Sequence, residues 1–480
     1  MESLEIADCM SPNESRGFIK DLLSLDAPML IDIGEPDHAV RLEFDRQKHL
    51  KSLRSLKLEF NCDLTRDYRK ALHFFGQLNV LHLNVLNFSD ISPYIEEYFP
   101  NLVELRLVRQ YSILSQKVQL KKTGTVSPSV HTNLKIFHFG GPTNFIDAFP
   151  YQADHGLVCI MQSELRDLIK SMPFLRELHL IGCMFDEYYE LENSTMDEYE
   201  AQNIGLDLMN WTPELEVLNL DRSSIWPMPS IPATCVKLTC NGYTSPTPER
   251  VVRRSGRWYY HSTDRPVDDT RLNEFKRIKD LTLLSFPGGV ESLLCCLARF
   301  QSLESLNLNE NSEVIAWGDP VSEELANFLI YDCGFSTRVL SCSTSLECIG
   351  VMFPRLKKLS IAYNGMTNDS VLESLGKYFP NLQYLDLSST MVSSHGITMY
   401  LWRDSIDHRP NFMSGYVLED YIKKRLPSKH TQTLQTLVLT NCQAVDPRFY
   451  KFWKSVGAAI YTDEYVMYDS RKSRRLEQNR

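Results

Sequence analysis

Residues able to contact a charged or polar group recur at one place in a repeated leucine pattern. Each lies between the second and third apolar positions of a Leu-x-x-Leu-x-Leu segment, and alternation along a strand directs that position away from the core. The early copies supply Lys57, His82, Arg106, His138, His179 and Asn219, and the later ones Thr282, Asn307, Ser360, Asp386 and Val438. We call these residues the strip. The sequence favours a protein or peptide partner for the strip, and the alternative is a polar surface that needs no ligand.

Metal binding and catalysis are not expected. His138 and His179 would lie on neighbouring strands if no worn repeat separates them, but zinc sites need three or four converging ligands. We therefore predict no metal and no cofactor. The sequence contains no phosphate-binding loop, no dinucleotide fingerprint, no His-Glu-x-x-His and no Gly-x-Ser-x-Gly. These absences predict a non-enzymatic protein.

The cysteines fit the same interpretation. None is arranged as Cys-x-x-Cys, and several fall at turn or helix positions of the repeats, where cysteine is a small buried hydrophobe. These are Cys183, Cys235, Cys240, Cys295, Cys296 and Cys442. Catalytic thiols are not expected among them.

A basic and aromatic segment within 242–270 is a second candidate contact site. It places Arg253 and Arg254 ahead of Trp258, and guanidinium groups and rings are suited to an acidic partner or an RNA strand. The alternative is a solvated loop. The chain carries 51 basic and 61 acidic residues, a net charge of −10, which disfavours general binding to nucleic acid.

The leucine segment itself returns at a regular period. Leu53, Leu78 and Leu102 begin copies 25 and 24 residues apart. Further copies begin at Leu134, Leu175, Leu215, Ile278, Leu303, Leu356, Leu382 and Leu434, with a degenerate copy at Ala233. Asn or Cys often follows the third apolar residue, as at Asn311 and Cys183, and is expected to turn the chain away from the strand.

Between these segments the apolar spacing changes to that of a helix. Asn368 is expected to cap a helix with Val371, Leu372 and Leu375 on its apolar face, and Glu323 and Glu324 read as the first turn of another. The pentapeptide Tyr-Phe-Pro-Asn-Leu occurs at 98–102 and again at 378–382. Its proline ends the helix and sets the start of the next strand.

On these residues the chain resembles the leucine-rich repeats of the cysteine-containing or ribonuclease-inhibitor-like type, especially those of F-box/leucine-rich-repeat proteins. The resemblance implies an α/β solenoid, a horseshoe with a parallel concave sheet and convex helices. It also implies a substrate receptor that brings a target protein to an SCF-type ubiquitin ligase through an adaptor. Residues 1–50 contain no recognisable F-box. The alternatives are a scaffold or regulatory adaptor unrelated to ubiquitin, and an RNA-associated regulator that uses the basic insertion.

The spacing also predicts the domain organisation. Residues 1–50 are expected to cap a repeat domain at 51–445, and residues 446–480 to form a second cap, with Phe449 and Ile460 at helical spacing, and a basic tail. Insertions are expected near 111–133, 186–200, 242–270, 312–350 and 391–430. The chain has neither a signal-peptide pattern nor a long apolar run, so we expect no membrane partner and a cytoplasmic or nuclear location, or both.

Overall fold

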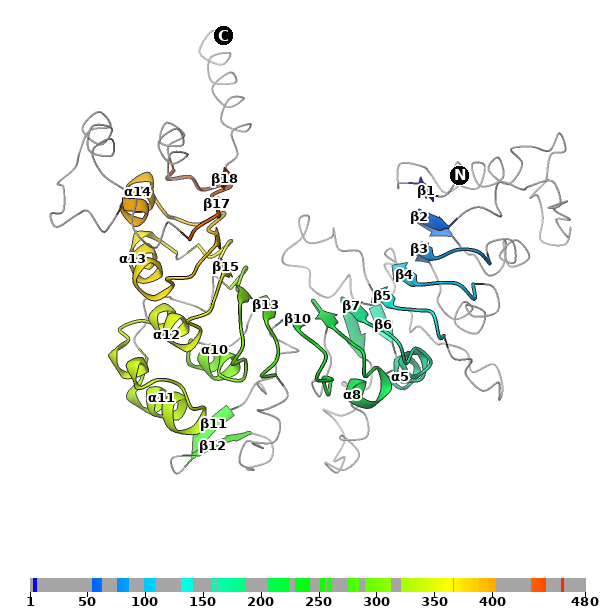
Figure 1. The fold of residues 1–480 in the computed structure, drawn as a ribbon, viewed down its shortest axis with the longest axis horizontal. Coiled ribbons are helices and arrows are strands. Elements are labelled where there is room, and N and C mark those ends of the chain that lie inside the picture. The colour runs from blue at the N-terminus through cyan, green and yellow to red at the C-terminus, as the bar shows by residue number, and fades with distance from the viewer. Residues whose placement is uncertain are drawn as a thin grey trace, which may run out of the picture. The chain divides into compact units, whose positions relative to one another are not determined.

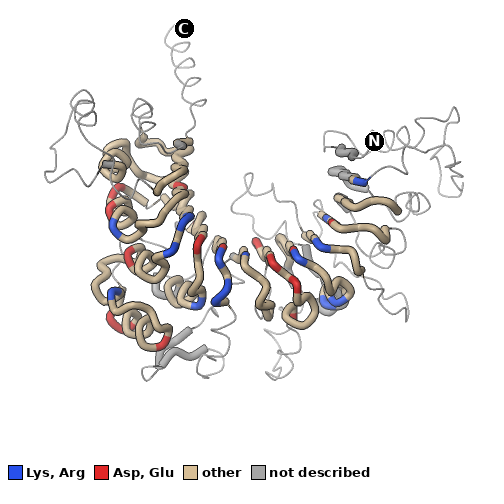
Figure 2. The backbone as a smooth tube through the Cα atoms, in the orientation of Figure 1, with Lys and Arg blue, Asp and Glu red and all other residues tan. Residues whose placement is uncertain are grey.

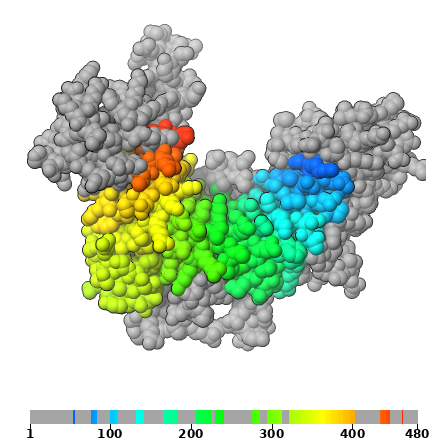
Figure 3. All heavy atoms as spheres, viewed as in Figure 1, coloured from blue at the N-terminus to red at the C-terminus, as the bar shows by residue number. Residues whose placement is uncertain are grey.

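The computed structural model divides into two compact units, Met1–Cys235 and Val236–Arg480. It describes residues 3–6, 54–62, 76–85, 99–108, 131–140, 158–160, 162–185, 206–223, 229–241, 251–254, 257–260, 275–284, 290–311, 321–365, 367–402, 433–445 and 459–461. Within each unit the repeats follow one another in chain order, as the successive bands of colour in Figure 3 show.

The first unit is built on parallel strands that pair in the order β1-β2-β3-β4-β5-β7-β9 (Figure 1). Their bounds are β1 Ser3–Ile6, β2 Ser55–Cys62, β3 Val80–Val85, β4 Glu104–Val108, β5 Ile136–Gly140, β7 Glu177–Ile181 and β9 Val217–Leu220. Two short strands, β6 (Val158–Ile160) and β8 (Cys183–Phe185), form a separate parallel pair. Helices α5 (Gln162–Lys170) and α8 (Leu208–Trp211) connect strands of this unit.

The second unit repeats this design with parallel strands in the order β10-β13-β14-β15-β16-β17-β18. Their bounds are β10 Lys237–Asn241, β13 Asp280–Leu284, β14 Ser305–Asn307, β15 Lys358–Ser360, β16 Tyr384–Asp386, β17 Thr436–Val438 and β18 Ala459–Tyr461. An antiparallel hairpin, β11 (Val251–Arg254) with β12 (Arg257–Tyr260), lies outside this sheet.

The helices of the second unit lie on one side of its strands (Figure 1). They are α10 Val290–Leu297, α11 Glu323–Asn327, the π-helix η8 Phe328–Asp332, the 3₁₀-helix η9 Thr337–Ser341, α12 Ser345–Met352, α13 Asp369–Tyr378 and α14 Ser394–Trp402. Helices α12, α13 and α14 pack against one another in chain order. Asn368 caps α13 as expected, since its Oδ1 accepts from the N–H of Ser370 at 3.0 Å, and Glu323 and Glu324 form the first turn of α11.

The core consists of the apolar positions of the repeat. Leu81, Leu105, Phe137, Leu178 and Leu218 occupy the middle position on consecutive strands and are at most 1% exposed. Burying one such side chain stabilises the fold by about 1.5–3 kcal/mol, and only stacked repeats can cover it on both sides. Each unit therefore has the α/β leucine-rich-repeat solenoid fold with an open parallel sheet.

The turns after six of the strands, β7, β9, β14, β15, β16 and β17, contain a residue in the left-handed region. Gly182, Arg222, Glu310, Tyr363, Ser389 and Asn441 all have φ between 55° and 62°, and each lies two residues after the third apolar position. The residue that follows is buried, and in most of these turns it donates to a carbonyl oxygen of the preceding repeat. Asn364 Nδ2 reaches the oxygen of Leu308 at 3.0 Å, and Cys442 Sγ reaches that of Leu387 at 3.1 Å. The Asn or Cys that the repeat pattern contains thus joins consecutive repeats.

The Pro-Asn-Leu motif has a similar role at the start of the strand. Asn381 Nδ2 donates to the carbonyl oxygen of Pro354 at 2.9 Å, and Asn101 Nδ2 donates to that of Gly76 at the same distance. Thr234 and Thr433 replace the asparagine in two repeats and donate to the equivalent carbonyls. The motif therefore ties each repeat to the one before it as well as ending the helix.

All twelve expected segments, including the degenerate one at Ala233, end in strands of these sheets. The expectation of a C-terminal helix that includes Ile460 is wrong at that residue, because Ile460 lies in β18 and pairs in parallel with Leu437. The edge strands β1 and β18 carry no Leu-x-x-Leu-x-Leu segment and were not expected. The domain boundaries at 50 and 445 stay predictions, since residues 7–53 and 446–458 lie outside the described residues.

Candidate functional site

The sheet register brings the strip into line within each unit. In the first unit Lys57 pairs with His82, His82 with Arg106, Arg106 with His138, and His138 with His179, which precedes Asn219. In the second unit the order is Thr282, Asn307, Ser360, Asp386 and Val438. The prediction of these alignments from the leucine spacing is confirmed. The backbone places Lys57, whose side chain lies outside the described residues.

Several strip residues have a structural role at the end of their strand. Asn219, Asn307 and Asp386 each accept, through Oδ1, a hydrogen bond from the backbone N–H two residues later, at 2.9, 3.0 and 2.9 Å. Ser360 Oγ donates to Asn309 Oδ1 at 2.7 Å and to Asp386 Oδ2 at 3.1 Å. These residues are therefore polar because the fold uses their hydrogen bonds. For them, the alternative of a polar surface that needs no ligand is sufficient.

The other residues of the first-unit strip form a different arrangement. His82 Nε2 lies 2.5 Å from Glu104 Oε1, and His179 Nε2 lies 3.3 Å from Glu177 Oε2. The imidazoles of His138 and His179 stack, with ring centroids 5.3 Å apart and an interplanar angle of 14°. Strands β5 and β7 are thus direct neighbours, which the sequence left open.

The centre of this arrangement is His138 with Arg106 beside it. His138 Nε2 is enclosed, and among the described residues it has no hydrogen-bond partner. Burial lowers the pKa of His138 from 6.5 to about 3, and the positive charges of Arg106, His179 and His82 act in the same direction. Among the described residues, Arg106 has no hydrogen-bond or ion-pair partner. At pH 7 the site therefore combines a neutral buried imidazole with an uncompensated guanidinium.

This shift makes the stability of the first unit sensitive to acid. The unfolded chain protonates His138 near pH 6.5, whereas the folded chain does so only near pH 3. The unfolded state therefore binds more protons between these values, and stability falls as pH drops through this range. From pH 7 to pH 5 the loss attributable to His138 is about 2 kcal/mol. In urea unfolding at both pH values, His138→Gln should lose less stability than the wild type.

A matched control for this experiment is His395→Gln, because His395 is exposed on α14. It should keep the pH dependence of the wild type. An equal loss of stability in His138→Gln and the wild type between pH 7 and pH 5 would contradict the assignment.

Glu104 and Glu177 were missed by the sequence reasoning, although the same alternation could have found them. Each lies two residues before a strip position on its own strand and so faces the same side of the sheet. Each strand has two outward positions, and the prediction considered only the one between the second and third apolar residues. Lysines and arginines are interspersed with acidic residues in both units, so charge alone does not mark the face (Figure 2).

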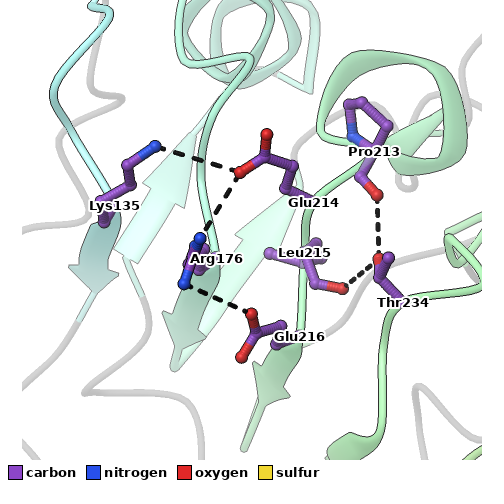
Figure 4. Close-up of polar contacts among 7 residues, drawn as sticks. All are labelled: Lys135, Arg176, Pro213, Glu214, Leu215, Glu216 and Thr234. Atoms are coloured by element: carbon purple, nitrogen blue, oxygen red, sulfur yellow. Dashed lines mark hydrogen bonds and ion pairs between the residues drawn. The ribbon is translucent and has the colours of Figure 1, made fainter.

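A second polar cluster lies at the start of the strands (Figure 4). Glu214 Oε2 is 4.0 Å from Lys135 Nζ and 3.8 Å from Arg176 Nε, and Arg176 Nη1 is 3.7 Å from Glu216 Oε1. These side chains are between 34% and 54% exposed, so each pair stabilises the fold by only about 0.2–1 kcal/mol. Their charges are mutually satisfied, which makes this cluster a structural feature of the repeats.

The basic segment contains the hairpin β11–β12 in place of an irregular loop. Arg253 pairs with Trp258 and Arg254 with Arg257 across it. The side chains of these residues lie outside the described part of the structure, and their contact role stays a prediction. The hairpin belongs to the second unit, as do the strip residues from Thr282 onward, whereas the strip residues from Lys57 to Asn219 belong to the first unit.

The described residues contain no group of three or more His, Cys, Asp or Glu side chains that could hold a metal ion. Their cysteines are unbridged, and of the six named above five are buried and Cys295 is half-buried. In the part of the chain that the structure describes, no helix has the length and apolar character needed to span a membrane.

No protein-family model matches the chain, and neither does a curated protein. Among solved structures, the chain is similar to the leucine-rich repeat domain of APL1B, at 10% identity and a TM-score of 0.34 over 92% of each chain. It is also similar to a chain of the mouse RP105/MD-1 complex, at 12% identity and a TM-score of 0.33, over 86% of this chain and 63% of that one. The repeat pattern and the sheet register carry the fold assignment.

Proposed function

We propose that the chain is a non-enzymatic protein-recognition scaffold whose first-unit sheet face contacts its partner. One observation supports this most strongly: the fold uses the side chains of Asn219, Asn307 and Asp386, but it leaves Arg106 without a described partner. A half-buried guanidinium without an ion-pair partner has a free-energy cost, which a bound partner would offset. Exposed sheet faces of stacked repeats offer a continuous surface for such a partner.

Site-specific photocrosslinking tests this proposal. A photoreactive phenylalanine analogue at position 106 of the full chain should capture one or a few discrete proteins in cells. The same analogue at Lys377, which is exposed on α13, is the matched control and should not capture them. An identical pattern at both positions, or no protein captured at position 106, would contradict recognition through this face.

A finer proposal follows from the resemblance to F-box/leucine-rich-repeat proteins. If the scaffold is a substrate receptor of an SCF-type ubiquitin ligase, purification of the full chain should recover an adaptor and a cullin together with a target protein. Recovery of the target alone would favour a scaffold or regulatory adaptor outside the ubiquitin system. Cytoplasmic or nuclear location stays a prediction.

The RNA-associated alternative depends on the basic segment. Its test is RNA crosslinking of the full chain before and after the double substitution Arg253→Glu and Arg254→Glu. Unchanged crosslinking would dismiss it, and the net charge of −10 already disfavours it.

A further inference from the structure

The central part of the first-unit strip has an incomplete pattern of charges. On the β3 side, the imidazole of His82 has the carboxylate of Glu104 at 2.5 Å. On the β7 side, the imidazole of His179 has the carboxylate of Glu177 at 3.3 Å. Between them, the guanidinium of Arg106 on β4 has no carboxylate within ion-pair distance among the described residues. The imidazoles of His82 and His179 are thus each paired with a carboxylate, and the guanidinium of Arg106 is not.

His138 lies among these basic side chains. Besides burial, Arg106, His179 and His82 each act to lower the pKa of this imidazole, and its Nε2 has no hydrogen-bond partner among the described residues. Glu104 and Glu177 are engaged by the outer histidines. A half-buried guanidinium in such a field is stabilised by an anion, and its planar fork is suited to a carboxylate.

We propose that the segment of the strip from His82 to His179 binds an acidic stretch of a partner protein, with a partner carboxylate paired to Arg106. This inference rests on the proposed function and names the chemistry of the partner at the same face. With this carboxylate bound, Arg106 is paired with a carboxylate, as His82 and His179 already are within the chain. It forms charge-assisted hydrogen bonds where the free protein leaves a cation uncompensated.

The geometry of a sheet suits an extended acidic segment. Adjacent strands lie about 4.8 Å apart, and alternate side chains of an extended peptide are separated by about 7 Å on one side. A peptide that crosses β4 therefore places one carboxylate at Arg106, with its next side chains on that side near the outer strands. Arg106 is a single guanidinium, with Glu104 on its own strand and Glu177 two strands away, which fits one isolated carboxylate. A phosphate backbone would bring further negative charges against those two carboxylates and a net charge of −10.

The test uses the full chain and a fluorescent peptide in which glutamate alternates with serine, measured by anisotropy. Wild-type protein should bind this peptide and should not bind the analogue with glutamine in place of glutamate. Arg106→Gln should weaken binding at least about tenfold, the factor that corresponds to 1.4 kcal/mol. Arg176→Gln is the matched control, because Arg176 is a guanidinium on the same unit that Glu214 and Glu216 already engage. It should leave the affinity unchanged.

Three results would overturn the inference: no binding of the glutamate peptide by the wild type, equal affinity of Arg106→Gln and wild type, or tighter binding of a single-stranded oligonucleotide than of the peptide. Crosslinking at position 106 separates this failure from that of the proposed function. If discrete proteins are captured there while the glutamate peptide does not bind, the face recognises a protein of different chemistry. If neither occurs, the proposed function fails as well.

Discussion

Replacing Asn364 with leucine should destabilise the second unit by about 3 kcal/mol or more. Asn364 is 1% exposed and makes three hydrogen bonds: its Nδ2 donates to the carbonyl oxygens of Leu308 and Ile361, at 3.0 and 2.9 Å, and its Oδ1 accepts from the N–H of Asn311 at 2.9 Å. Leucine has a similar volume but makes none of these bonds; the oxygen of Leu308 still accepts from Asn311 Nδ2 at 2.9 Å, whereas the bonds to Ile361 O and from Asn311 N–H are lost. Each buried group left unsatisfied costs about 1–3 kcal/mol. Urea unfolding monitored by circular dichroism measures the change.

The matched control is Asn381→Ala in the next repeat. Asn381 is exposed and makes one hydrogen bond, to the carbonyl oxygen of Pro354 at 2.9 Å, so its loss should cost about 1 kcal/mol. Both asparagines join consecutive repeats, and they differ in burial and in the number of hydrogen bonds that they make. Equal destabilisation by the two substitutions would contradict the role assigned to the buried, three-bond Asn364.

Replacing Gly140 with alanine should be as damaging to the first unit, at about 3 kcal/mol or more. Gly140 ends β5 with φ of 142°, a conformation that other residues rarely adopt. A Cβ atom there would lie 1.8 Å from the carbonyl oxygen of Ile181 on β7, which is backbone and cannot rotate away. The backbone conformation and the collision each contribute about 1–3 kcal/mol. The change in the free energy of unfolding, measured in urea, gives the sum of the conformational and steric costs.

Two other glycines separate these contributions. A Cβ on Gly334 would meet no atom within 4 Å, but its φ is 76°, so Gly334→Ala should show the conformational cost alone. Gly365 also has open space around its Cβ position and no such φ, so Gly365→Ala should be nearly neutral. If Gly140→Ala costs no more than Gly334→Ala, the close approach of β5 to β7 is not the cause.

The separation of β5 from β7 also affects the candidate site. His138 lies two residues before Gly140 and stacks on His179 of β7. A substitution that moves these strands apart would separate the imidazoles as well. The glycine is therefore a structural requirement for the arrangement around Arg106 and is unsuitable as a probe of binding.

Much of the fold could be predicted because one physical constraint repeats. Two inward residues per strand must be buried, and a helix or turn must return the chain to the same edge, so the leucine spacing places each of the twelve strands that carry it and their outward residues. This is why His82, Arg106 and His138 could be aligned from the leucine spacing, whereas the structure was needed to show that the strand of His179 is the next neighbour. The edge strands β1 and β18 escaped this reasoning because a strand at the end of the sheet has a neighbour on one side only and needs no full set of leucines.

The sequence by itself determined the repeat, the direction of each outward side chain and the order of residues along the strip. Only the tertiary structure decided which of those residues the fold itself uses. Asn219 and Asp386 are bound by their own turns, Asn364 and Cys442 reach into preceding repeats, and Arg106 is left without a described partner beside an enclosed His138. The reason is that hydrogen bonds between repeats depend on distances between residues 25 to 56 positions apart, and those within a turn depend on its backbone geometry. The period specifies neither.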